Sequence, residues 1–179
     1  NKGLPISCFG NYVEDSLKGL GDNYIENIWM TSQGGGIGTY WGDVRSNGAK
    51  TSKGSKSTGV IPFLHCVDAQ MLGYAQGVSR RGSNAAYIDI SHPEIEEFLG
   101  IRKPTGGDIN RKSLNLHHGV CIPDSFMELL EAQLNGESIV DDWPLIDPST
   151  KETVKTISAR ALWEKILETR METGEPYIM

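Results

Sequence analysis

Short apolar segments alternate with segments of helical periodicity along most of this chain. Strands are expected at residues 4–9, 37–41, 85–90 and 119–122, and a further strand is expected to open at residues 176–179. The segments between them carry apolar residues at helical spacing. A strand followed by a helix and another strand is the repeating unit of parallel sheets. The order therefore predicts an α/β fold built around one sheet or barrel.

Polar residues mark where the expected helices begin and where the chain leaves regular structure. Capping chemistry is expected at Asp15–Ser16, at Ser91 with Glu94, and at Ser125 with Glu128, and a further helix is expected to begin at Ser158. The segment 43–59 is a polar loop rich in Ser, Gly, Lys and Thr, and a loop of that length in a compact domain is typically functional or mobile. The segment 141–156 contains two prolines and is expected to be irregular.

Composition excludes several classes of protein. The 179 residues fit one domain, and 38% hydrophobic residues argue against disorder. A net charge of −6 argues against a nucleic-acid polymer as partner, and no run approaches the roughly 18 apolar residues of a membrane span. Three widely spaced cysteines indicate a reducing, cytoplasmic location. The apolar end at 176–179 leads us to expect a piece of a larger polypeptide.

The three cysteines suggest different roles. Cys8 lies on the first expected strand, where it is either a small buried hydrophobe or a redox thiol that faces a ligand. Cys66 and Cys121 follow histidines but lack the close ligand spacing of structural zinc sites. We therefore expect no metal site, core positions for Cys66 and Cys121, and hydrogen-bonded structural roles for the histidines.

Two loops combine glycine with basic residues. The cluster at 34–38 is neither a dinucleotide-binding fingerprint nor a phosphate-binding P-loop, so it marks either a generic turn or a close approach to a ligand. Arg45 and three lysines lie in the 43–59 loop, and Arg80–Arg81 lie in a second glycine loop. Flexible cations beside backbone N–H groups suit a phosphate chain, although a solvated loop has the same composition. The Asp15 carboxylate could accept a hydrogen bond from a ribose hydroxyl, cap a helix, or do both.

Taken together, these segments resemble the large, catalytic subunit of class I ribonucleotide reductase. The resemblance is carried by Leu4–Cys8, Asp15–Leu17, Gly35–Gly38, Gly42–Arg45, Thr58–Phe63, Gln76–Gly82 and Ser91–Leu99. It implies that residues 1–179 form the N-terminal half of a catalytic domain. That domain is a ten-stranded α/β barrel in the family, so the barrel would be incomplete in this chain.

The resemblance also implies an activity and two groups of site residues. The family reduces ribonucleoside diphosphates to 2′-deoxyribonucleoside diphosphates through a thiyl radical and a redox-active cysteine pair, with Cys8 as one member. Substrate contacts are implied for Ser7, Cys8, Gly35 and Gly36. A specificity site for a deoxynucleoside triphosphate or ATP, at a dimer interface, is implied for Asp15, Ser16, Leu17, Arg45 and Lys53. A loop that relays the identity of that effector to the substrate is implied for Gln76, Gly77, Arg80, Arg81 and Gly82.

The same resemblance implies the partners. They are the polypeptide that completes the barrel, a second catalytic subunit, and a small subunit that carries a metal-radical cofactor. Thioredoxin or glutaredoxin would be the reductant, and this chain itself would bind no cofactor. The alternative is a non-catalytic nucleotide-binding module that regulates another protein.

Overall fold

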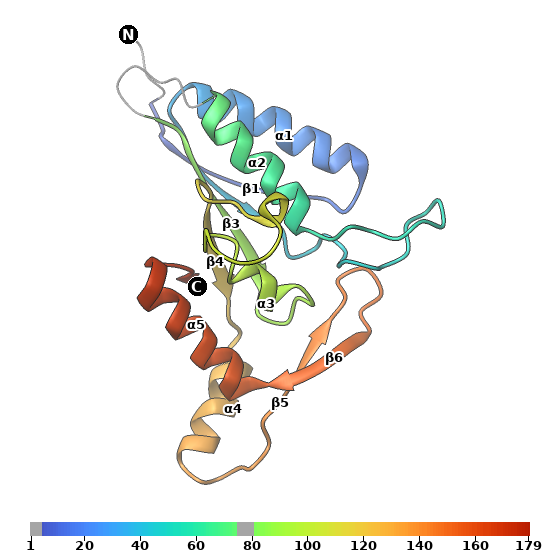
Figure 1. The fold of residues 1–179 in the computed structure, drawn as a ribbon, viewed down its shortest axis with the longest axis vertical. Coiled ribbons are helices and arrows are strands. Elements are labelled where there is room, and N and C mark those ends of the chain that lie inside the picture. Colours follow the sequence, from blue (N-terminus) through green and yellow to red (C-terminus); the bar gives the residue numbers. More distant parts are fainter. Residues whose placement is uncertain (1–4, 75–80) are drawn as a thin grey trace.

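The chain forms an open parallel sheet with a helical layer on one face (Figure 1). The computed structural model describes residues 5–74 and 81–179. Five strands lie in the order in which they follow one another in the sequence: β1 (Cys8–Tyr12), β2 (Gly36–Tyr40), β3 (Ser83–Asp89), β4 (His117–Cys121) and β7 (Tyr177–Ile178). Every neighbouring pair is parallel. The predicted α/β class is confirmed.

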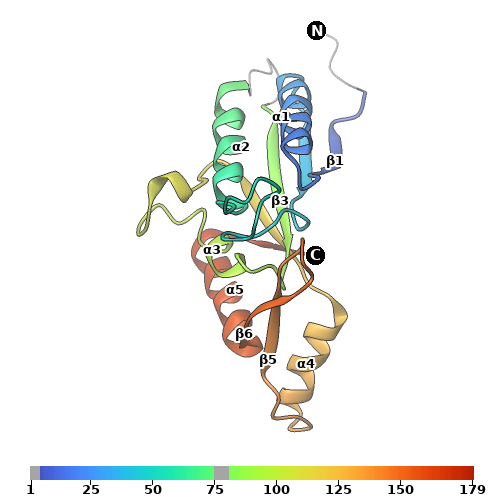
Figure 2. The ribbon, with the colours of Figure 1, turned by 90° about the vertical axis from the view of Figure 1, so that its right-hand side faces the viewer.

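Helices connect the successive strands. They are α1 (Leu17–Ser32), α2 (Ile61–Tyr74), α3 (Ile95–Phe98), the short 3-10 helix η1 (Ile109–Arg111), α4 (Asp124–Leu134) and α5 (Ala159–Thr173). Figures 1 and 2 show α1 and α2 side by side over the strands, where the Tyr24 hydroxyl donates to the Phe63 carbonyl at 3.3 Å. The core lies between these helices and the sheet, and Ile37, Ile88 and Leu64 are buried in it.

The two faces of the sheet differ in burial. Side chains alternate between faces along a strand. On β2, Ile37 and Thr39 are buried beneath the helices, whereas Gly36, Gly38 and Tyr40 are partly exposed on the opposite face. On β1, the three residues of that opposite face (Cys8, Gly10 and Tyr12) are all exposed. We call this the open face; no described element covers it over β1.

The connection from β4 to β7 contains a feature that the sequence interpretation missed. The segment expected to be irregular forms an antiparallel hairpin, β5 (Asp142–Ile146) and β6 (Thr153–Ser158) (Figure 1). Pro144 lies within β5 opposite Thr156. This hairpin is two-stranded, so each strand has a free edge, and proline is tolerated there although it cannot donate to a ladder.

One of the three predicted helix caps is correct, and the helix expected to begin at Ser158 is capped by that residue. Ser16 accepts from the Gly19 amide at 2.9 Å, and Ser158 accepts from the Ala161 amide at 3.0 Å. The capping boxes at Ser91–Glu94 and Ser125–Glu128 are wrong, because α3 and α4 begin without a side-chain cap bond. Pro123 occupies the α4 cap position, and the Glu94 carboxylate is directed to other backbone amides.

The remaining differences concern burial and strand limits. The first strand begins at Cys8 and runs to Tyr12, whereas Ile6 is 63% exposed outside it. Leu134 on α4 and Leu167 on α5 are apolar but exposed. Both helices carry enough other apolar residues to bury one face, so these positions are free to face outward.

Candidate functional site

The predicted substrate residues lie at the amino end of the sheet. Cys8 and Gly36 are partners in the β1–β2 register, and Gly36 is in turn the partner of Ser83 on β3. The Cys8 thiol is exposed, so its interpretation as a buried hydrophobe is wrong. The Ser7 hydroxyl lies 4.0 Å from the Cys8 sulfur, and the Ser7 carbonyl accepts from the Gly36 amide at 2.7 Å. Ser7, Cys8 and Gly36 are therefore brought together.

Gly35 has a packing role, and the substrate contact implied for it stays a prediction. It is buried, and a Cβ atom there would lie 2.9 Å from the Met30 carbonyl oxygen and 2.9 Å from the Phe9 ring. Close packing between the end of α1 and the first strand is therefore sufficient to require glycine at this position.

The predicted effector residues surround one cavity of about 640 Å³ at the amino end of α1. Its lining includes all five of them: Asp15, Ser16, Leu17, Arg45 and Lys53. The rest of the lining consists mainly of hydroxyl and basic residues of the 43–59 loop. An α-helix presents free N–H groups and a partial positive charge at its amino end, which favours an anion there.

Asp15 and Arg45 form an ion pair at the mouth of this cavity. The Arg45 Nε donates to both Asp15 carboxylate oxygens, at 2.8 and 3.1 Å, and its Nη1 donates to the Lys50 carbonyl at 2.8 Å. Both side chains remain about one quarter exposed. The Arg45 guanidinium can replace one of its present hydrogen-bond acceptors with a phosphate oxygen, and the Asp15 carboxylate can accept a hydrogen bond from a hydroxyl. The pair thus provides one group of each kind that a nucleotide requires.

The 43–59 loop is ordered by a short hairpin of its own and by anchors at its base. Lys50 and Lys56 form an antiparallel bridge within it. The buried Glu94 carboxylate accepts from the amides of Asn47 and Val60, at 3.2 and 2.9 Å, and so joins the two ends of the loop. Burial raises the pKa of Glu94 although these bonds oppose the rise.

A second carboxylate anchors the same loop. Asp147, at the turn between β5 and β6, accepts from both the amide and the hydroxyl of Ser46. It also accepts from the amides of Ser149 and Thr150. Burial raises the pKa of Asp147, but these hydrogen bonds outweigh burial and hold the pKa well below the usual range. The unpredicted hairpin therefore supports the predicted effector loop.

The described part of the predicted relay loop, Arg81 and Gly82, lies near the carboxyl end of α1. Gln76, Gly77 and Arg80 lie outside the described residues. Arg81 is exposed, and a Cβ atom on Gly82 would lie 2.7 Å from Thr31 near the carboxyl end of α1. Because α1 has 16 residues, it separates Gly82 from the effector cavity by about 24 Å. Of the relay residues that the structure describes, neither Arg81 nor Gly82 lines the cavity that contains Asp15 and Arg45.

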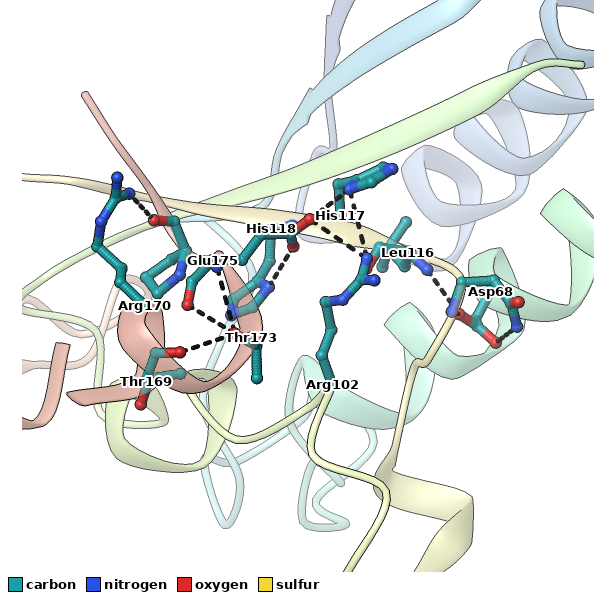
Figure 3. Close-up of polar contacts among 11 residues, drawn as sticks. Asp68, Arg102, Leu116, His117, His118, Thr169, Arg170, Thr173 and Glu175 are labelled. Atoms are coloured by element: carbon teal, nitrogen blue, oxygen red, sulfur yellow. Dashed lines mark hydrogen bonds and ion pairs between the residues drawn. The ribbon is translucent and has the colours of Figure 1, made fainter. Parts of the chain in front are cut away.

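A cluster around Glu175 was not predicted (Figure 3). The Glu175 carboxylate contacts the Nδ1 atoms of His117 and His118, accepts from the His118 amide at 3.1 Å, and lies 3.3 Å from the Arg102 guanidinium. Burial raises the pKa of Glu175, but the bonds from the two histidines and the charge of Arg102 outweigh it and lower the pKa to about 2. The structural role expected for these histidines is confirmed.

Another cavity, of about 550 Å³, lies at the carboxyl ends of β2, β3 and β4. Asp89 and Cys121 line it, and the Tyr40 hydroxyl donates to Asp89 at 2.6 Å. Burial raises the pKa of the Cys121 thiol. Cys66 is exposed on α2, so its expected core position is wrong.

Across residues 5–74 and 81–179, no group of three or more His, Cys, Asp or Glu side chains is placed to hold a metal ion. Within the same part of the chain, every helix is too short or too polar to span a bilayer.

Comparison with known proteins supports one family. Residues 6–179 match the family described as "Ribonucleotide reductase, barrel domain". The chain is 53% identical over 98% of its length to the putative ribonucleoside-diphosphate reductase large subunit of Frog virus 3 (isolate Goorha), of which it covers 29%. It is 49% identical over 99% of its length to the ribonucleoside-diphosphate reductase large subunit of Invertebrate iridescent virus 6, of which it covers 18%.

A solved structure agrees with these relatives. The Actinobacillus ureae class Id ribonucleotide reductase alpha subunit matches 99% of this chain with a TM-score of 0.72 and 30% sequence identity. The match covers 27% of that subunit, so the chain spans less than a third of each of these three proteins. Because the family match includes nearly every residue of the sheet and its helices, this chain belongs to the ribonucleotide reductase barrel-domain family.

Proposed function

We propose that residues 1–179 form the N-terminal half of the catalytic barrel of a ribonucleoside-diphosphate reductase. The observation that carries this proposal is the cavity at the amino end of α1, which all five expected effector residues line. Arg45 and Lys53 are at least 28 residues from Asp15–Leu17 in the sequence, and a solvated loop would not require the two groups to converge. The three relatives described above are reductase subunits by name, which supports the same activity.

In the proposed reaction, the ribose 2′-hydroxyl leaves as water and a hydrogen replaces it at C2′. This reduction takes two electrons, which two thiols supply as they lose two protons and close to a disulfide. Cys8 is one of these thiols; the second, and the cysteine that carries the thiyl radical, lie in the polypeptide that completes the barrel. The exposed Cys8 sulfur beside the bare backbone of Gly36 supports contact with a sugar.

The proposal includes partners that the open surfaces of the chain support. Along α1, Leu17, Ile25 and Trp29 are 80%, 57% and 69% exposed, which suits a second catalytic subunit at the effector site. The metal-radical cofactor would reside on a small subunit, and thioredoxin or glutaredoxin would restore the dithiol. A cytoplasmic location stays a prediction.

Paired variants of the complete reductase test the two sites separately. Cys8→Ser is expected to abolish product formation while a deoxynucleoside triphosphate still binds. Arg45→Ala, which removes a guanidinium that suits the phosphates, is expected to weaken triphosphate binding about tenfold or more. Equilibrium binding and deoxynucleotide yield are the measurements, and Arg160→Ala on the exposed start of α5 is the control.

Each outcome distinguishes the alternatives. Full turnover by Cys8→Ser with a dithiol reductant would remove that thiol from the mechanism. Unchanged triphosphate affinity in both Arg45→Ala and Asp15→Ala would contradict the effector site. Triphosphate binding without any reduction, even with all other subunits present, would favour the non-catalytic regulatory module.

A further inference from the structure

Hydrogen-bonding side chains occupy the layer between α1 and the sheet, where apolar packing is the rule. Asn23 and Asn27 extend from α1, and Asn11, Thr39 and Asn84 extend from β1, β2 and β3. Asn23, Asn27, Thr39 and Asn84 are each at most 2% exposed. We refer to these five residues as the amide cluster.

Asn27 is the centre of this cluster. Its side-chain carbonyl lies 3.4 Å from the Nδ2 atoms of both Asn84 and Asn11. Its own Nδ2 donates to the Asn23 carbonyl oxygen at 2.8 Å. Asn84 additionally donates to the Thr39 hydroxyl at 3.1 Å. One side chain of α1 is therefore bonded to the first and third strands of the sheet.

Stability alone does not explain the cluster. The Asn23 Nδ2 and the Asn11 Oδ1 are buried without a hydrogen-bond partner, and such groups destabilise a fold. Apolar side chains of similar volume would avoid that cost but would tolerate sliding and rotation of the helix. Directional amide bonds permit one rotation and one axial position of α1 on the sheet.

The helix α1, whose position on the sheet the amide cluster fixes, runs between the two proposed sites. Asp15 and Ser16 line the effector cavity at the amino end of α1, about 24 Å from its other end. Asn84 is the second residue of β3 and follows Ser83, which is the register partner of Gly36. Gly82 passes within contact of Thr31 at the carboxyl end of the same helix. A displacement of α1 at the effector cavity would therefore move the start of β3.

We infer that the amide cluster positions the start of β3 according to the effector bound at α1, so that Asn27 and Asn84 determine how strongly the effector changes substrate choice. These asparagines touch neither nucleotide and act as positioning residues. The inference rests on the proposed function, since it presumes an effector cavity and a substrate at Cys8 and Gly36.

The test uses the complete reductase with its radical-generating subunit. The rates of reduction of purine and pyrimidine ribonucleoside diphosphates are compared in the presence of each deoxynucleoside triphosphate in turn. In Asn27→Leu and Asn84→Ala, the change in the purine-to-pyrimidine ratio between effectors should fall at least about fivefold, the lower bound for typical coupling between sites. Triphosphate affinity should stay within about twofold of the wild type, because the cavity residues are untouched.

Two controls separate coupling from lost stability. Thr169→Val removes a buried hydroxyl of α5 that donates to the Lys165 carbonyl at 2.8 Å, and it should leave the effector response unchanged. Asn84→Ser keeps a short donor and acceptor and should retain part of the response, so it carries the test if Asn27→Leu does not fold.

Full effector-dependent selectivity in Asn84→Ala, Asn84→Ser and Asn27→Leu would overturn the inference while leaving the proposed function intact. A wild-type enzyme whose selectivity ignores every triphosphate would overturn both.

Discussion

Single residues in this chain acquire their role from neighbours that are remote in the sequence. Glu175 is 58 residues from His117, yet its carboxylate bonds to both histidines of β4 and so fixes the turn after α5 against the sheet (Figure 3). Arg45 meets Asp15 across 30 residues. A pattern based on short spacing identifies the residue types but cannot pair them.

Ionisation of Glu175 should make the stability of the fold depend on pH. Its pKa is about 2 in the folded chain against an ordinary value of 4.5, so the ionised form stabilises the fold above pH 4.5, and that stabilisation is lost as the pH falls towards 2. The contribution is on the order of 2 kcal/mol. Glu175→Gln in the complete subunit should therefore lower the melting temperature at pH 7 and flatten its dependence on pH between 4.5 and 2.

The matched control is Glu172→Gln, which alters a carboxylate that is 59% exposed beside Lys103. It should leave both the melting temperature and its pH dependence close to those of the wild type. Parallel melting curves for the wild type and Glu175→Gln across this pH range would show that the cluster contributes no acid-sensitive stability.

At the scale of elements, the hairpin β5–β6 and the 43–59 loop depend on each other. The loop is polar and has little core of its own, so its order comes from two carboxylates that accept its backbone amides. One of these, Asp147, is on the hairpin turn. The hairpin therefore supports the loop that lines the proposed effector cavity, although it does not line that cavity itself.

Asp147→Asn should loosen that loop. N–H and O–H donors approach both carboxylate oxygens, and an amide can accept on one side only. Amide hydrogens of residues 47–58 should exchange faster, and triphosphate affinity should fall about tenfold, as expected for loss of a buried hydrogen bond to a charged group. Asp142→Asn, at an exposed position of β5, is the control. Unaltered exchange in 47–58 would exclude the anchoring role.

At the scale of the whole molecule, the sheet is covered on one face only. The open face presents small residues and tyrosines, and β7 leaves its outer edge free beyond Tyr177 and Ile178, which are 42% and 44% exposed. An uncovered apolar face and an unpaired strand edge both promote association with other chains. The rest of a barrel domain would cover both.

The isolated 179-residue chain should therefore self-associate. Size-exclusion chromatography with light scattering should detect species larger than a monomer, and co-expression with the remaining part of the barrel domain should suppress them. A monodisperse monomer that unfolds cooperatively would contradict the proposal that other protein covers the open face.

The sequence by itself determined the order of the helices and of the strands in the five-stranded sheet, the cap at Ser16, the start of α5 near Ser158, and the residue types of both proposed sites. These features depend on local periodicity and on hydrogen bonds a few residues apart. Tertiary structure alone decided the exposure of Cys8, the β5–β6 hairpin, the amide cluster and the length of α1 between the cavity and Gly82. Each of these depends on which faces pack together, and packing joins residues that no short pattern connects.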